Sequence, residues 1–355
     1  MSDETALPGT GAAQGFGQLA ERAVHRLYER SPESRQFISS SYQACLEDME
    51  HHARALAVAL ETGEQRLLDD YATWAKALLA HRGLPDSCLV GALLALQETV
   101  AESQDPAADR AVAMLQAALA RLAEADPTIP PSIDPSDDLA PMAARYLELL
   151  LAGDRPEAMR LVLDAASEGI AIRDLYDRVL RAVQHEVGRL WQSGRVSVAM
   201  EHYITGVNQV LMARLYPVVA DRPSAGPKFV GACVGGERHE LGIRMVCDLL
   251  QLEGWDAVCL GADTPVDAIV AALAEHKPAV LGLSATLGFN VPQTRRFIEA
   301  ARAAAGETRV HVIVGGRPFD VVPDLWRRVG ADGYAPSASA AAEWARSLVG
   351  GGQVA

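Results

Sequence analysis

Two short motifs in the second half of the chain combine side chains that could serve a metal-centred chemistry. In the first, Glu237 precedes His239 by two positions, within the segment GGERHELG of residues 235–242. Imidazole is the commonest nitrogen ligand for transition metals, and a nearby carboxylate can hold the other ring nitrogen in the required tautomer. We therefore take His239 as a candidate metal ligand oriented by Glu237; the alternative is a loop histidine with a solvated neighbour.

The second motif is Trp191-x9-Glu201-His202, in the stretch GRLWQSGRVSVAMEHYI. The pattern predicts that Trp191 lies near the end of one helix and that Glu201 and His202 begin the next, across a turn at Gly194. Three side chains of different chemistry could then converge on one point. The alternative is a core tryptophan and a carboxylate that only stabilises the start of its helix.

The elements that must position the first motif begin at Phe229. Short apolar runs alternate from there with amphipathic stretches, which predicts a doubly wound parallel sheet of five strands. The runs are FVGACV, AVCLG, AVLGLSAT, RVHVIVGG and DGYA. Ligands of such sheets bind beyond the carboxyl ends of the strands, and Glu237 and His239 follow the first run directly.

With 355 residues the chain is too long for one ordinary domain. We predict an α + α/β protein in which only the last segment contains strands. The predicted segments are a disordered tail (1–15), an all-helical domain (16–126), a proline-rich linker (127–139), a four-helix bundle (140–222) and the β/α domain (228–350).

Composition excludes several classes of function. The net charge of −14 gives no general attraction to nucleic acid or to an anionic membrane. There is no secretory leader pattern and no long apolar run, so we expect a cytoplasmic protein. The five cysteines form no CxxC pair, which predicts reduced and mostly buried thiols rather than disulfides or a zinc site.

The first motif and the strand ends after it resemble the signature of cobalamin-binding domains with a flavodoxin-like sheet. Glu237-x-His239-x-x-Gly242 is similar to their DxHxxG pattern, with Glu in place of the usual Asp. The resemblance implies that His239 ligates cobalt from below and that the other strand ends surround the cofactor and its dimethylbenzimidazole tail. The residues at those ends are Asp263, Thr264, Ser284, Thr286, Gly315 and Gly316. A flat heterocycle beside a strand needs glycine, whose backbone carries no side chain.

The second motif is similar to that of CarH-type B12-dependent photoreceptors. This resemblance implies that Trp191 packs against the adenosyl group of adenosylcobalamin and that Glu201 accepts hydrogen bonds from it. Light would break the cobalt–carbon bond, and His202 would then ligate cobalt from above. Winged-helix features, which such repressors carry, are missing from residues 16–126, where 10 basic residues stand against 19 acidic ones in the first 126.

The helical pattern of residues 16–126 resembles globin-like sensor domains, and the whole arrangement resembles the photocobilins, which carry biliverdin beside B12. The resemblance implies a noncovalent bilin pocket, with stacking aromatic rings and imidazoles. Candidate pocket residues are His51, His52, Tyr71, Trp74 and His81. A plain dimerisation domain is the alternative.

We therefore predict a non-enzymatic light sensor that binds adenosylcobalamin and biliverdin. It is expected to be a homo-oligomer whose state depends on light, to act on an unknown protein effector, and to contact neither nucleic acid nor membrane. One alternative is a corrinoid shuttle that works with a methyltransferase. Another is a haem-binding redox or gas sensor that uses a histidine of the helical domain.

Overall fold

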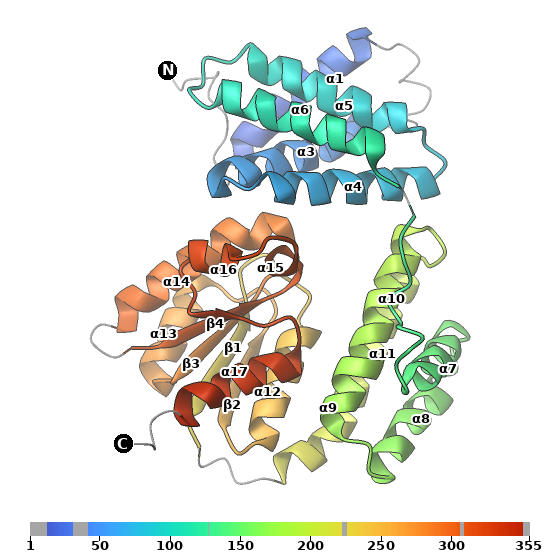
Figure 1. Ribbon diagram of the computed structural model, residues 1–355, viewed down its shortest axis with the longest axis vertical. Helices are drawn as coiled ribbons and strands as arrows, with labels where there is room; N and C mark the ends of the chain where they lie inside the picture. Colours follow the sequence, from blue (N-terminus) through green and yellow to red (C-terminus); the bar gives the residue numbers. More distant parts are fainter. Residues whose placement is uncertain (1–12, 31–41, 127, 222–225, 306–308, 351–355) are drawn as a thin grey trace. The chain divides into compact units, whose positions relative to one another are not determined.

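The computed structural model describes residues 13–30, 42–126, 128–221, 226–305 and 309–350 and divides into two compact units, Met1–Ile129 and Pro130–Ala355 (Figure 1). No described helix combines the length and the hydropathy needed to cross a membrane.

The described part of the first unit is built from helices and the turns between them. The helices are α1 (Ala13–Arg30), α3 (Tyr42–Thr62), α4 (Gln65–His81), α5 (Asp86–Ala101) and α6 (Ala108–Glu124). Their apolar faces are buried against one another, with Leu56, Leu68 and Leu93 almost completely inaccessible to solvent. The buried Lys76 ammonium donates to the carbonyls of Leu122 and Ala125 at 2.8 and 2.9 Å, which satisfies acceptors at the end of α6.

A five-stranded parallel sheet forms the centre of the second unit. Its strands are β1 (Lys228–Cys233), β2 (Asp256–Gly261), β3 (Val280–Ser284), β4 (His311–Gly315) and β5 (Gly333–Tyr334), in the order β2-β1-β3-β4-β5. This is the flavodoxin-like order, and it confirms the predicted α/β class. Strand β1 is buried from its second residue onward because helices cover both faces.

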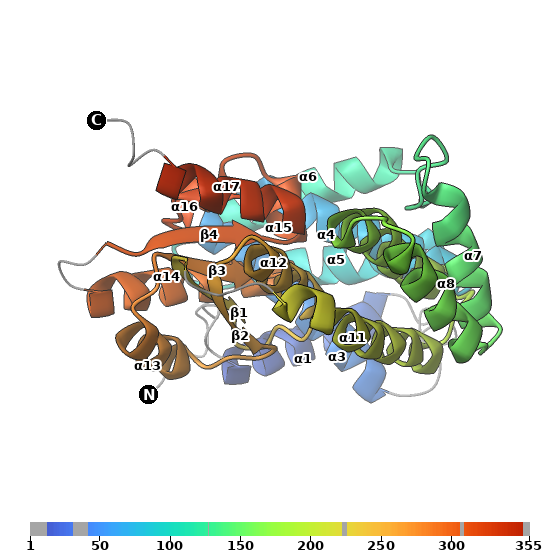
Figure 2. The same cartoon turned by 90° about the horizontal axis from the view of Figure 1, so that it is seen from below.

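The helices of the β/α region cover the two faces of the sheet. Figures 1 and 2 show α12 (Leu241–Leu252) and α17 (Ala338–Gly350) on one face, and α13 (Val266–His276) and α14 (Val291–Ala305) on the other. The short elements are the 3-10 turn η2 (Gly288–Asn290), α15 (Arg317–Val321) and α16 (Leu325–Arg328). The turns after β1, β2, β3 and β4 therefore meet at one edge of the sheet.

A group of helices precedes the sheet in the same unit. It comprises α7 (Ala140–Leu151), α8 (Arg155–Ser167), α9 (Ile172–Asp174), the π-helical η1 (Leu175–Leu180), α10 (Arg181–Gln192) and α11 (Val198–Ala220). Elements α9, η1 and α10 are continuous along the chain. The Tyr176 hydroxyl donates to Asp248 of α12 at 2.7 Å, and Arg173 donates to Glu253 at 2.7 Å. These contacts join the helices to the sheet-covering layer.

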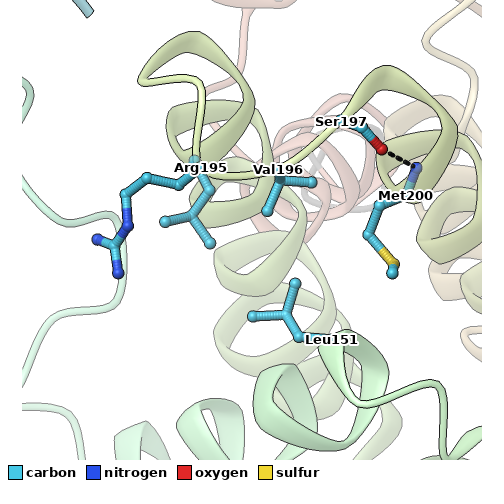
Figure 3. Close-up of a pocket in the computed structure, with 6 residues that line it drawn as sticks. Leu151, Arg195, Val196, Ser197 and Met200 are labelled. Atoms are coloured by element: carbon cyan, nitrogen blue, oxygen red, sulfur yellow. Dashed lines mark hydrogen bonds between the residues drawn. The ribbon is translucent and has the colours of Figure 1, made fainter.

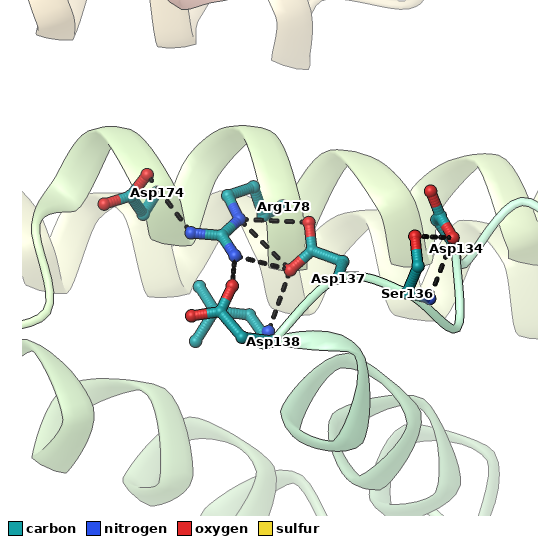
Figure 4. A network of polar contacts seen from close by, with 7 residues as sticks. Asp134, Ser136, Asp137, Asp138, Asp174 and Arg178 are labelled. Carbon is teal, nitrogen blue, oxygen red and sulfur yellow. Dashed lines mark hydrogen bonds and ion pairs between the residues drawn. The ribbon is translucent and has the colours of Figure 1, made fainter.

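The segment that leads into α7 is held against η1 by a charged network (Figure 4). Arg178 donates to Asp137 at 2.6 Å, lies 3.6 Å from Asp174 and also pairs with Asp138. Asp134 accepts the hydroxyl and the backbone N–H of Ser136 at 2.7 and 2.9 Å, which closes a local turn. A stretch that the sequence presents only as proline-rich therefore makes specific contacts with the helices.

Candidate functional site

The loop after β1 carries the first Glu–His pair. The Glu237 side chain is fully buried, whereas 58% of the His239 side chain is exposed. Glu237 Oε1 lies 2.5 Å from Nδ1 of His239 and accepts its backbone N–H at 3.0 Å. A proton on Nδ1 leaves the lone pair of Nε2 for a ligand, and Nε2 makes no hydrogen bond to any residue that the structure describes.

The second oxygen of Glu237 is held by the loop after β3. Oε2 accepts the N–H groups of Thr286 and Leu287 at 2.6 and 3.1 Å and the side-chain amide of Asn290 at 3.0 Å. Burial on its own would raise the pKa of Glu237, but the hydrogen bonds from His239 and Thr286 outweigh it and lower this pKa to about 2. The carboxylate is therefore charged at neutral pH and has a fixed position.

The second motif lies within electrostatic reach of the first. The hydrogen bond to its carboxylate partner raises the pKa of His239, burial opposes this, and the charge of Glu201 on α11 contributes in the same direction as the hydrogen bond. A chain of contacts also joins α11 to the strand ends. Gln209 donates to Glu240 Oε1 at 2.9 Å, and Glu240 Oε2 accepts the N–H of Ala262 at 3.1 Å.

The turn after β2 is locked to the turn after β1. Asp263 Oδ1 accepts the N–H of Gly236 at 2.7 Å, and the Asp263 N–H donates to the carbonyl of Glu237 at 2.8 Å. Thr264 is buried, and its N–H donates to the carbonyl of Cys233 at 3.1 Å. Two residues predicted from sequence to lie near the cofactor, Asp263 and Thr264, therefore shape the loop that carries the Glu–His pair.

The glycine turn after β4 leaves no room for a side chain at one of its two positions. Gly316 has φ +112°, and a Cβ placed on it would lie 2.1 Å from the carbonyl oxygen of Ala285. The backbone of the chain itself therefore already excludes a side chain at this position. Ser284 is half-buried at the end of β3, and Gly315 has more room, since its Cβ would lie 3.2 Å from the carbonyl of Ala335. Gly242 is exposed on α12, with open space around its Cα.

The residues of the second motif lie on the two sides of the turn between α10 and α11. Trp191 is half-buried at the end of α10, and Glu201 and His202 belong to the first turn of α11. Ser197 caps α11 by accepting the N–H of Met200 at 3.2 Å. Glu201 Oε2 lies 2.5 Å from Nδ1 of His202, whose side chain is 75% exposed.

A chain of side-chain hydrogen bonds runs from Glu201 into the helical core. The Thr205 hydroxyl donates to Glu201 Oε1 at 2.9 Å, and Gln184 of α10 donates to Thr205. Asn208 donates to Gln184 at 2.7 Å, and Tyr146 of α7 donates to Asn208 at 2.7 Å. Asn208 and Tyr146 are fully buried, and every donor in the chain points toward the Glu201 carboxylate, so each bond polarises the next.

Sequence reasoning missed the residues whose hydrogen bonds hold the two glutamate carboxylates in place. Asn290 reaches Glu237 across 53 positions, and Tyr146 reaches Asn208 across 62. Only Thr205 leaves a local signal, because it lies four residues after Glu201 on the same helix.

A small pocket opens beside the turn that precedes Glu201 (Figure 3). It has a volume of about 330 Å³ and a mostly apolar lining, and it contains neither Glu–His pair. The lining residues are Leu151, Leu190, Arg195, Val196, Ser197 and Met200. The pocket therefore lies behind the capping turn of α11 and does not include the strand ends.

The five candidate bilin residues are only partly brought together. His52 Nδ1 lies 2.7 Å from the Tyr71 hydroxyl, and the Tyr71 and Trp74 ring centroids are 6.2 Å apart. Burial lowers the pKa of His52 to about 4, so this imidazole is neutral at pH 7. His51 is exposed, and His81 Nδ1 contacts the carbonyl of Ala77 on its own helix at 2.8 Å. A bilin site here stays a prediction.

Two family models, each described as a B12 binding domain, match the second unit. One covers residues 227–343, the β/α region, and the other covers residues 142–216, the helices before it. Neither covers the first unit, so the globin-like assignment of that unit gains no support from them. The two matches indicate a cobalamin-binding protein.

The similar proteins of known name include several corrinoid proteins. Dimethylamine corrinoid protein 2 of Methanosarcina acetivorans is 29% identical over 193 residues, which are 53% of this chain and 87% of that protein. Trimethylamine corrinoid protein 1 of the same organism is 27% identical over 52% of this chain and 87% of its own. The HTH-type transcriptional repressor CarA of Myxococcus xanthus is 32% identical over 123 residues, 35% of this chain and 41% of the repressor.

A solved structure shares the fold. The monomethylamine corrinoid protein of Methanosarcina barkeri superimposes with a TM-score of 0.52 at 20% identity, over 57% of this chain and 96% of that one.

These relatives overturn the prediction of a light sensor. Two of them are named as a dimethylamine and a trimethylamine corrinoid protein, and these favour the corrinoid shuttle that stood as the alternative. The spacing of Trp191 and Glu201 misled the prediction because a short turn between two helices produces it, and a carboxylate in the first turn of α11 is also stabilised by the helix dipole. The role of His202 after illumination belonged to that prediction and is not retained.

Proposed function

We propose that this chain is a corrinoid carrier that works with a methyltransferase. The observation that carries the proposal is the His239 imidazole, exposed at the end of β1 with Nδ1 fixed by a buried carboxylate. The relatives named as dimethylamine and trimethylamine corrinoid proteins support it. In this role the chain is a carrier and not an enzyme, in agreement with the sequence prediction.

The donor set fits a cobalt that arrives with its corrin ring. No group of three or more His, Cys, Asp and Glu side chains in the described residues could hold a metal ion on its own. A corrin supplies four nitrogens, so one axial ligand from the protein is enough, and Nε2 of His239 has the required chemistry. Bound cobalt would supply the chemistry of accepting and releasing a methyl group. Glu237 would keep the imidazole in the ligating tautomer.

The remaining predicted residues would enclose the cofactor. Asp263, Thr264, Ser284, Thr286, Gly315 and Gly316 would border its lower side, at the ends of β2, β3 and β4. The helices of residues 140–220 would act as a four-helix cap, with Trp191 and Glu201 toward the upper side. The polar chain from Tyr146 to Glu201 would keep that carboxylate in place.

Retention of different cobalamins tests this function. Protein reconstituted separately with methylcobalamin and adenosylcobalamin is passed through a desalting column, and the cobalamin that stays bound is measured by absorption. A carrier of methyl groups should retain methylcobalamin at least as well as adenosylcobalamin and should lose it in His239→Ala. His276→Ala, at the end of α13, is the matched control. Retention of adenosylcobalamin alone would contradict the proposal.

The bilin in the first unit is tested with the same protein. Absorption spectra after addition of biliverdin or haem show whether either tetrapyrrole binds, and Trp74→Ala then asks whether the cluster of His52, Tyr71 and Trp74 holds it.

A further inference from the structure

One cysteine of the second unit is the exception to the predicted mostly buried thiols. Cys259 is exposed, whereas Cys45, Cys88, Cys233 and Cys247 are buried. It belongs to β2, which lies at the edge of the sheet. Cys247 lies on α12, the helix that connects β1 to β2.

The register of the sheet places the two thiols together. Cys259 pairs with Gly231 of β1, and paired residues on neighbouring parallel strands point to the same face. A Cβ placed on Gly231 would lie 2.7 Å from Sγ of Cys247. Cys247 therefore lies directly over the site where Gly231 has no side chain, on the face of the sheet to which Cys259 also points.

We propose that Cys247 and Cys259 are a thiol pair that a peroxide converts into an intramolecular disulfide. The Cys259 thiolate attacks the O–O bond, which breaks to give a sulfenic acid and, after protonation of the leaving hydroxide, one water. The Cys247 sulfur then attacks the Cys259 sulfur, and the sulfenic oxygen leaves as hydroxide, which takes the Cys247 proton and becomes a second water. Two thiols are oxidised and one hydrogen peroxide is reduced.

The surroundings of the two thiols assign these roles. The hydrogen bond from Cys247 lowers the pKa of Cys259, although burial opposes it, and the Gly261 N–H and the Arg244 guanidinium lower it further. The same hydrogen bond, together with burial, raises the pKa of Cys247. Cys259 is also the thiol that solvent reaches, as a first target of peroxide must be.

The bridge would clamp α12 to β2. Helix α12 begins, and strand β2 ends, at the sheet edge that carries the candidate site. Glu240 immediately precedes α12 and accepts the N–H of Ala262, which follows β2. The thiol pair does not depend on the proposed function, since it rests on the register of β1 and β2 and on the position of Cys247 over Gly231.

Peptide mapping of the full chain tests the proposal. Reduced protein without cofactor is treated with equimolar hydrogen peroxide, its remaining thiols are blocked with iodoacetamide, and the digest is analysed by mass spectrometry. The expected result is a cross-linked peptide with Cys247 and Cys259, two hydrogens lighter than the sum of its parts, and a fall from five free thiols to three.

Two variants serve as comparisons. Cys259→Ser, a change at an exposed position, should abolish the cross-link, whereas Cys88→Ser, in the other unit, should leave it intact. A single oxidised Cys259 beside a blocked Cys247 would overturn the proposal, and so would a cross-link between two chains through Cys259.

Discussion

The two Glu–His pairs share one contact and differ in everything around it. In both, a glutamate oxygen lies 2.5 Å from Nδ1 of the histidine. Glu237 is fully buried and its second oxygen accepts three further hydrogen bonds, whereas Glu201 keeps 25% of its side chain exposed and its other oxygen accepts one, from Thr205.

This difference separates a histidine fixed by the sheet from one held only by its own helix. The donors to Glu237 come from the loop after β3, about fifty residues away, so the position of His239 is set by the folded sheet. The donors to Glu201 lie one and four residues away on its own helix. The second pair can therefore move with α11, while the first cannot move without opening the sheet edge.

The largest expected effect follows from removing the buried carboxylate. Glu237→Ala leaves the N–H groups of Thr286 and Leu287 and the amide of Asn290 without their acceptor. We expect a loss of about 3 kcal/mol in the free energy of unfolding, measured by urea denaturation. Glu201→Ala is the matched variant and should cost less than about 1 kcal/mol. Equal losses would remove the distinction between the pairs.

The second largest effect is the loss of stability that acid should cause at the first Glu–His pair. The pKa of Glu237 is about 2 in the folded protein against 4.5 for an ordinary glutamate, so its contribution is present above pH 4.5 and lost as pH falls toward 2. Linkage gives a contribution of about 3 kcal/mol. The difference in unfolding free energy between wild type and Glu237→Gln should therefore shrink as pH falls from about 5 to about 2. A constant difference would contradict this.

His239 contributes with the opposite sign. Its pKa is raised above the ordinary 6.5, so this contribution is present below pH 6.5 and is lost as pH rises through the folded pKa.

A smaller loss of stability is expected when the hydrogen-bond chain that holds the second Glu–His pair is broken. Thr205→Val removes the donor to Glu201 and the acceptor of Gln184, and should cost about 1–2 kcal/mol by urea denaturation. Thr99→Val is the matched control, because the Thr99 hydroxyl donates only to the Ala95 carbonyl of its own helix. Its removal leaves no donor without an acceptor, so the loss of unfolding free energy should stay below about 1 kcal/mol. Equal costs would show that the polar chain adds nothing to the position of Glu201.

The smallest effect should come from His202→Ala. With 75% of the side chain exposed, the unfolding free energy should change by less than about 0.5 kcal/mol. Thermal unfolding of the variant checks this, and a clear fall in Tm would mean that the second pair is as firmly built into the fold as the first.

The β/α alternation and the spacing of Glu237 and His239 were enough to predict the sheet class and the first candidate site. Both are local properties, since strands alternate with helices along the chain and the pair lies within one loop. The identity of the partners was not predictable. Asn290 and Tyr146 act across more than fifty residues, and no periodicity reports a tertiary contact of that kind.

Motif spacing also misled where a simpler cause produces the same pattern. The capped turn before α11 explains the separation of Trp191 and Glu201 without any light chemistry. At Gly316 the Ala285 carbonyl already excludes a side chain, a requirement that the spacing of the motif does not reveal. Cys259 is exposed because β2 lies at the edge of the sheet. The spacing of cysteines along the sequence does not reveal the order of the strands.

The central claim is that Nε2 of His239 is the axial ligand of a bound corrinoid. Electron paramagnetic resonance of the Co(II) form, bound to protein labelled with ¹⁵N-histidine, tests it directly. Ligation by His239 should give the two-line splitting of one ¹⁵N nucleus, and this splitting should be absent in His239→Ala. The three-line splitting of ¹⁴N from the cofactor's own base would contradict it.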